Sequence, residues 1–167
     1  AWSNSLFEDA AEFGYGMLLA QNAIRGGLKT KVEDLAANAE KEDVKAAAKE
    51  WLDTYGCGAT NGTATDKLVA ALEACGCDKA QAILKDKEFL AKKSQWIFGG
   101  DGWAYDIGFG GVDHVLASGQ DINIMVFDTE VYSNTGGQAS KATPTGAIAQ
   151  FAAGGKDVKK KDLASIA

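Results

Sequence analysis

The segment Gly99-Gly100-Asp101-Gly102-Trp103 decides the fold that we expect, because it directly follows a short apolar run, Gln95–Phe98. A second apolar run, Ile122–Phe127, leads into the polar stretch Asp128-Thr129-Glu130-Val131-Tyr132-Ser133-Asn134-Thr135-Gly136-Gly137-Gln138. Each run is typical of a buried strand, and the residues between them predict a helix over about 103–118. The sequence therefore predicts an α/β domain in which both polar loops lie beyond the carboxyl ends of parallel strands.

The composition indicates a globular protein without a nucleic-acid or membrane partner. The 167 residues are 46% hydrophobic, and 23 acidic against 17 basic residues give a net charge of -6. Phosphate backbones need a basic patch, and the cluster Lys159–Lys161 is followed at once by Asp162, so we interpret it as a solvated face. No apolar stretch approaches the roughly 20 residues of a membrane helix.

The N-terminus and the cysteines indicate the setting of the chain. Ala1 is not Met and no signal peptide follows it, so we expect the chain to be part of a longer polypeptide. The expected location is the cytoplasm or, in an anaerobic eukaryote, a hydrogenosome-like organelle. Three cysteines, Cys57, Cys75 and Cys77, argue against a disulfide framework and favour a reducing compartment. The spacing Cys75-Gly76-Cys77 matches no common zinc or cluster motif, and we interpret it as a turn at a helix end.

The first 94 residues predict helices separated by turns. Ser5-Leu6-Phe7-Glu8 has the pattern of a capping box, so a helix should run to about Arg25 and end at Gly26-Gly27. The further elements expected are a helix from a second capping box at Thr30 to about Tyr55 with a break near Glu42, a loop over Gly56–Thr65, and helices near Asp66–Ala74 and Asp78–Lys92.

The segment after the second strand predicts a long loop over Asp128–Pro144, and loops of that length are usually functional. A helix over Thr145–Ala153, stopped by Gly154-Gly155, and the start of another at Lys161–Ala167 should follow. Two strands do not make an independently stable sheet, so we expect the chain to be part of a larger protein.

The two strand-end loops point to a bound phosphate and a cation. The glycines beside Asp101 let the backbone approach a ligand, and the following helix would direct N–H groups at a phosphate. A carboxylate at the same place requires a cation such as Mg²⁺ between them. Thr129, Asn134 and a carbonyl such as that of Val131 are candidate oxygens, with Asp128 or Glu130 as alternatives to Thr129. A simple turn at Gly100-Asp101-Gly102 remains the other interpretation.

The sequence resembles pyruvate:ferredoxin (flavodoxin) oxidoreductases in two long stretches. These are GDGWAYDIGFGGVDHVLASGQDINIMVFDTEVYSNTGGQASKATPTGAIAQFAAGGK, residues 100–156, and AWSNSLFEDAAEFGYGM, residues 1–17. The resemblance implies a thiamine diphosphate-binding fold, a parallel sheet flanked by helices, incomplete in this chain. Its parts would be an N-terminal helix segment (1–30), a helical insertion (31–93) and a Mg-diphosphate-binding β-α-β segment (94–167).

The resemblance also implies the chemistry. That family decarboxylates pyruvate oxidatively to acetyl-CoA, with coenzyme A as co-substrate, and passes electrons through [4Fe–4S] clusters to ferredoxin or flavodoxin. Asp101, Thr129 and the Val131 carbonyl would bind Mg²⁺, and Gly100 and Gly102 would line the diphosphate of thiamine diphosphate. Asn134 would lie near the thiazolium and the substrate, as the one catalytic residue, and Asn4–Glu8 would pack at the same pocket. A homodimer and the remaining domains of the same enzyme are the implied partners.

Some residues depart from that family or carry competing interpretations. None of the three cysteines matches a cluster motif, so no cluster ligand is assigned, and no residue here can take the role of the glutamate that activates the cofactor. Trp96 and Trp103 could pack on the cofactor, although core packing is the more common role, and His114 should be structural or at the surface. A non-catalytic acidic interaction module and a generic nucleotide-binding domain remain alternatives, the latter without a G-x-G-x-x-G motif after the first strand.

Overall fold

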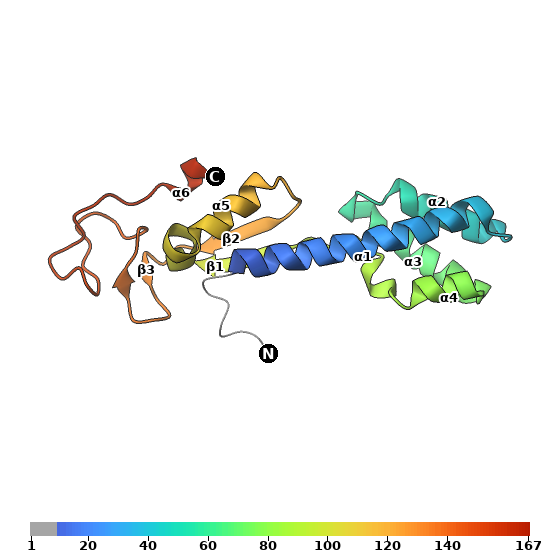
Figure 1. Ribbon diagram of the computed structural model, residues 1–167, viewed down its shortest axis with the longest axis horizontal. Coiled ribbons are helices and arrows are strands. Elements are labelled where there is room, and N and C mark those ends of the chain that lie inside the picture. The colour runs from blue at the N-terminus through green and yellow to red at the C-terminus, as the bar shows by residue number, and fades with distance from the viewer. Residues whose placement is uncertain (1–9) are drawn as a thin grey trace. The chain divides into compact units, whose positions relative to one another are not determined.

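The computed structural model describes residues 10–167, which form two compact units (Figure 1). One unit comprises the described residues up to Leu18 together with Gln95–Ala167, and the other comprises Leu19–Ser94. Helix α1 (Ala10–Asn38) contributes residues to both. The capping box expected at Ser5 and the segment Asn4–Glu8 lie outside the described residues.

The unit over Leu19–Ser94 is helical. After α1 it contains α2 (Glu42–Asp53), α3 (Gly58–Cys75), α4 (Asp78–Leu84) and a 3-10 turn, η1 (Lys87–Phe89). Apolar side chains from all four α-helices form its core. The buried members are Leu28, Val32, Leu35, Val44, Ala47, Ala48, Trp51, Ala64, Leu68, Leu72, Ala80, Ile83 and Leu90.

Two predictions in this unit are wrong, and packing explains both. α1 continues through Gly26-Gly27 and Thr30, because Leu28, Val32 and Leu35 beyond them are buried and outweigh the cost of about 1 kcal/mol for each glycine. The region expected as a loop over Gly56–Thr65 is mostly the start of α3. Its polar residues looked like loop residues, but Asn61 and Thr65 are buried and hydrogen-bonded, and Thr65 Oγ1 accepts from Trp51 Nε1 at 3.2 Å.

Three other expectations here are confirmed in outline. The break near Glu42 is present, since α2 begins there. A helix does cover Asp66–Ala74, as the second half of α3, and α4 begins at Asp78 although it ends earlier than expected.

The other unit is α/β and contains the predicted strand–helix–strand. Strands β1 (Trp96–Gly100) and β2 (Asn123–Phe127) pair in parallel, with Ile97 opposite Ile124 and Gly99 opposite Val126. Between them the predicted helix is present in two pieces, the π-helical turn η2 (Gly102–Ile107) and α5 (Phe109–Ala117). The exposed His114 lies on α5, as expected.

The two faces of this sheet differ. Side chains alternate across a strand, so Ile97, Ile124 and Val126 point to one face, where they pack with Trp103, Val112 and Val115. The opposite face carries four large apolar side chains that are 44–57% exposed: Trp96, Phe98, Met125 and Phe127. Phe98 stacks on both Trp96 and Phe127 with ring centroids 6.0 Å apart. Core packing of Trp96 is therefore a wrong prediction, whereas Trp103 is buried.

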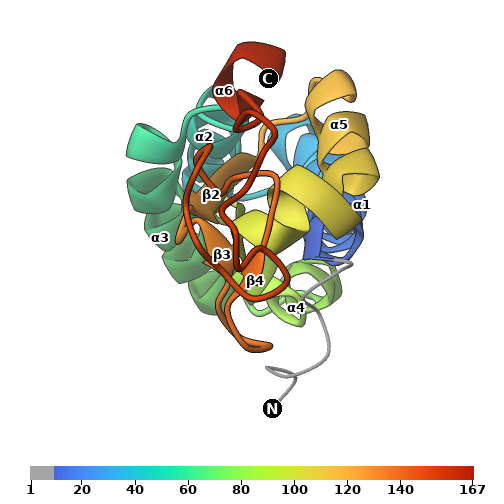
Figure 2. The ribbon, with the colours of Figure 1, turned by 90° about the vertical axis from the view of Figure 1, so that its left-hand side faces the viewer.

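The chain after β2 differs from the prediction in two places (Figure 2). The expected loop contains a short hairpin, β3 (Val131–Tyr132) with β4 (Gln138–Ala139), and the chain ends in the short helix α6 (Leu163–Ile166). The helix predicted over Thr145–Ala153 is absent. Gly146 has φ 82 and Phe151 has φ 64, and neither value is compatible with a right-handed helix. The backbone of this segment instead forms hydrogen bonds outside a helical pattern, such as Gly146 N–H to Lys156 O at 2.7 Å.

Candidate functional site

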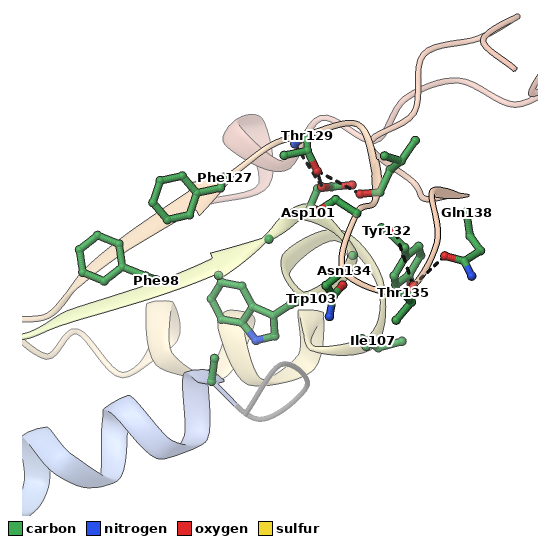
Figure 3. A pocket seen from close by; sticks show the side chains of 16 residues that line it. Phe98, Asp101, Trp103, Ile107, Phe127, Thr129, Tyr132, Asn134, Thr135 and Gln138 are labelled. Carbon is green, nitrogen blue, oxygen red and sulfur yellow. Dashed lines mark hydrogen bonds between the residues drawn. The ribbon is translucent and has the colours of Figure 1, made fainter. Parts of the chain in front are cut away.

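Asp101 is the centre of the candidate site. It follows β1 directly and precedes η2, and only 1% of its surface is exposed. Its Oδ1 accepts hydrogen bonds from the backbone N–H of Thr129 at 3.2 Å and from Thr129 Oγ1 at 2.9 Å (Figure 3). Because β1 and β2 are parallel neighbours, the residues that follow them meet at one edge of the sheet.

The third predicted oxygen lies at the same place. Thr129 Oγ1 also lies 3.1 Å from the carbonyl oxygen of Val131, which competes with Asp101 Oδ1 for the single proton of this hydroxyl. The intervening Glu130 has φ 66, so the chain turns back sharply between the two. The structure thus brings together a carboxylate, a hydroxyl and a carbonyl oxygen, the hard donors that Mg²⁺ prefers.

Ser140 also belongs to this site, although the sequence did not predict it. Its Oγ donates to Asp101 Oδ2 at 2.6 Å, and it is itself buried at the end of the β4 segment. Both carboxylate oxygens of Asp101 are thereby held in place. The only signal in the sequence was the position of Ser140 in the long loop expected to be functional.

An open cavity of about 740 Å³ lies beside these residues in the α/β unit. Glycines shape its wall, because a Cβ on Gly99 would overlap the ring of Trp103 and one on Gly102 would overlap the ring of Tyr132. The lining residues come from β1, η2, the end of β2 and the segment after it, with Ala10 at the start of α1 (Figure 3). The predicted site residues among them are Gly100, Asp101, Gly102, Trp103, Thr129, Val131 and Asn134.

Asp128 and Glu130, the alternative ligands, turn to other partners. Asp128 Oδ2 accepts from Tyr105 at 3.0 Å and from Lys160 at 2.7 Å. Partial burial opposes ionisation, but the hydrogen bonds from Lys160 and Tyr105 lower the pKa of Asp128. Burial and the bond to Asp128 raise the pKa of Tyr105. The Glu130 carboxylate is 3.8 Å from Lys160 Nζ. Thr129 is therefore the residue of this loop that faces Asp101.

The candidate metal ligands include one carboxylate, and the cysteines lie elsewhere in the chain. Within residues 10–167, no three His, Cys, Asp or Glu side chains gather as a metal site. Asp101 is the single carboxylate among the described residues that line the cavity. The three cysteines belong to the helical unit, and Cys75-Gly76-Cys77 is the predicted turn at the end of α3. None of the helices in that described range is long and apolar enough to cross a membrane.

Comparisons with known proteins place these residues in context. Half of the chain is identical to part of a pyruvate-flavodoxin oxidoreductase of Klebsiella pneumoniae, 50% over 169 residues. Identity is 51% over 174 residues with a pyruvate:ferredoxin oxidoreductase of Moorella thermoacetica, and 45% over 180 residues with a mitochondrial pyruvate dehydrogenase [NADP(+)] of Euglena gracilis. The chain is similar to one segment of pyruvate oxidoreductases.

This similarity covers the whole chain but a small part of the relatives. The chain spans 14% of the Klebsiella protein, 15% of the Moorella protein and 9% of the Euglena protein. No model of a protein family matches the chain. All three relatives are named as enzymes that oxidise pyruvate, and two of the names include an electron-accepting protein.

Proposed function

We propose that this chain provides the Mg²⁺-diphosphate side of a thiamine diphosphate site in an enzyme that oxidises a 2-oxo acid. The observation that carries the proposal is the meeting of Asp101, Thr129 Oγ1 and Val131 O beside the cavity. The identity of about half the residues with segments of pyruvate oxidoreductases supports it independently.

Each site residue then has a defined task. Asp101, Thr129 and the carbonyl of Val131 would hold Mg²⁺, with the carboxylate of Asp101 supplying the charge. Gly100, where an added Cβ would meet nothing within 4 Å, leaves room for the diphosphate, with Gly102 and Trp103 beside it. Bound thiamine diphosphate supplies an electron sink for decarboxylation. Asn134, which also lines the cavity, would orient the substrate and is our single catalytic assignment.

The complete reaction that we propose follows the names of the relatives. Pyruvate and coenzyme A would be the substrates, and electrons would pass through [4Fe–4S] clusters to ferredoxin or flavodoxin. We assign no cluster ligand in this chain, and the other domains of the enzyme and a second subunit would be its partners. A cytoplasmic location fits this chemistry.

The Asp101 carboxylate provides the test. In the full-length protein, Mg²⁺ with thiamine diphosphate should raise the melting temperature, and Asp101→Asn should weaken Mg²⁺-dependent binding at least about 100-fold. The matched control is Asp113→Asn, an exposed carboxylate on α5 that should bind as the wild type does. Circular dichroism establishes that each variant is folded.

Two results would contradict the proposal. One is a folded Asp101→Asn protein that keeps the full shift in melting temperature with Mg²⁺ and thiamine diphosphate. The other is a wild-type protein that shows no shift, which would favour the non-catalytic interaction module instead.

A further inference from the structure

Two cysteine thiols touch in the helical unit, far along the chain from the Asp101 site. Cys75 is the last residue of α3 and Cys77 directly precedes α4. Cys75 Sγ lies 3.1 Å from Cys77 Sγ and donates a hydrogen bond to it. Cys77 is exposed and Cys75 is partly exposed, so reagents in solution can reach the pair.

The backbone between them explains this contact. Gly76 has φ 65, a left-handed conformation that glycine adopts at helix ends without strain, and its N–H bonds to Leu72 O at 3.1 Å. Cys77 is extended, with φ -73 and ψ 161, so only Gly76 and Cys77 connect α3 to α4. The two side chains therefore emerge on the same side of the turn.

The surroundings of Cys77 favour its thiolate. The thiol of Cys75 is the strongest of the hydrogen-bond donors that lower the pKa of Cys77, and backbone N–H groups of Ala80 and Lys79 add to it. The thiolate is the form of cysteine that attacks disulfides. Among residues 10–167 no third His, Cys, Asp or Glu joins the pair, whereas a structural zinc site needs four ligands. The geometry therefore suits exchange between two thiols and a disulfide.

We propose that Cys75 and Cys77 form a redox-active dithiol that is oxidised by low-molecular-weight disulfides. Cys77 thiolate attacks one sulfur of the reagent, a mixed disulfide forms, and the first reagent thiolate leaves and takes up a proton. Cys75 then loses its proton and attacks Cys77 Sγ, which releases the second reagent thiolate. The two cysteines lose two electrons and two protons in total, and the reagent disulfide is reduced to two thiols.

The required movement is small. A sulfur–sulfur contact of 3.1 Å must shorten by about 1 Å to reach a disulfide bond. A disulfide that opens and closes also agrees with the cytosolic setting that we propose, where disulfides are usually transient. The proposal does not depend on the function assigned to the Asp101 site.

Cys57 is a built-in control. It is exposed, it directly precedes α3, and hydrogen bonds from Thr60 and the backbone lower its thiol pKa as well. It lies at the opposite end of the 18-residue α3, about 27 Å from Cys75, so it has no partner thiol on that helix within reach. Cys57 and Cys77 thus differ chiefly in whether a second thiol lies beside them.

The experiment treats the folded chain with oxidised glutathione, quenches with acid, alkylates the remaining thiols and maps peptides by mass spectrometry. The peptide that contains Cys75 and Cys77 should become lighter by two hydrogens, and neither cysteine in it should be alkylated. Cys57 should retain a glutathione adduct. In Cys75→Ser the adduct should persist on Cys77, and dithiothreitol should restore every free thiol.

The wild-type chain alone can refute the proposal, so the test does not depend on a variant that folds. A stable glutathione adduct on Cys77, with Cys75 still free, would show that the second thiol does not attack. Reaction at Cys57 with both Cys75 and Cys77 left reduced would be equally decisive against it.

Discussion

At the scale of single residues, the candidate site depends on how Asp101 is held. Its two oxygens have separate donors, Thr129 on one side and Ser140 on the other. Hydrogen bonds to both oxygens fix the orientation of the carboxylate. Supporting residues tune a metal site in this way.

Ser140→Ala tests this arrangement. It removes one donor and leaves the buried Asp101 Oδ2 without it, so Mg²⁺-dependent binding of thiamine diphosphate should weaken by about 10- to 100-fold. Calorimetric titration measures the affinity. Ser140→Thr keeps the hydroxyl and should restore most of the binding, whereas equal loss in both variants would argue that Ser140 acts through packing only.

The thiol of Cys77 provides a prediction of pH dependence. Because hydrogen bonds lower its pKa, the thiolate form should persist to lower pH than in an ordinary thiol of pKa about 8.5. The rate of alkylation of Cys77 by iodoacetamide should therefore have its midpoint below that pH. The midpoint should rise in Cys75→Ala, which removes the principal donor. An unchanged midpoint would contradict this assignment.

At the scale of elements, the strand–helix–strand was predictable, as were the starts of α2 and α4, whereas the C-terminal ends of α1 and α4 were not. Apolar runs and the polar loops after them identified β1 and β2, and through them the meeting of Asp101, Thr129 and Val131. The helix end predicted at Gly26-Gly27 is wrong, because buried side chains further along α1 decide whether that helix continues. Phe151 lies within the helix predicted over Thr145–Ala153, yet it is 92% exposed in an irregular loop. Local pattern cannot reveal such long-range packing.

The glycines of β1 differ in role, and the difference can be measured. Gly99→Ala should lower the free energy of unfolding by about 1–3 kcal/mol, because its Cβ would overlap the buried ring of Trp103. Gly100→Ala is the matched control, since its Cβ meets nothing within 4 Å. Urea denaturation measures both. Equal stability of the two variants would show that Trp103 can move aside.

Arg25 joins separate elements of the helical unit. Its guanidinium donates to Leu90 O at 3.1 Å, Tyr55 O at 3.0 Å and Asn61 Oδ1 at 2.8 Å, and lies 4.1 Å from the centroid of the Tyr55 ring. Arg25 thereby ties α1 to α3 and to the segments after α2 and α4.

Arg25→Met should therefore lower the free energy of unfolding by about 2–4 kcal/mol. Lys29→Met, one turn later on the same helix, removes a more exposed cation that makes an ion pair 3.7 Å long with Glu33. That control should cost less than about 1 kcal/mol. Similar losses in both variants, measured in urea, would show that Arg25 contributes only as a surface charge.

At the scale of the whole molecule, two separate apolar cores imply two regions of stability. One core belongs to the helical unit and the other to the α/β unit. Hydrogen exchange followed by mass spectrometry resolves them by peptide. Arg25→Met should speed exchange in peptides from 19–94, and Mg²⁺ with thiamine diphosphate should slow it in peptides from 95–167. A uniform change across the chain in either experiment would mean that the units unfold as one.

The half-exposed row of Trp96, Phe98, Met125 and Phe127 has a practical consequence for handling the protein. About half of the surface of each of these four side chains is exposed, and water solvates apolar surface poorly. Preparations limited to these 167 residues should become turbid as they are concentrated, and a mild detergent should keep them clear.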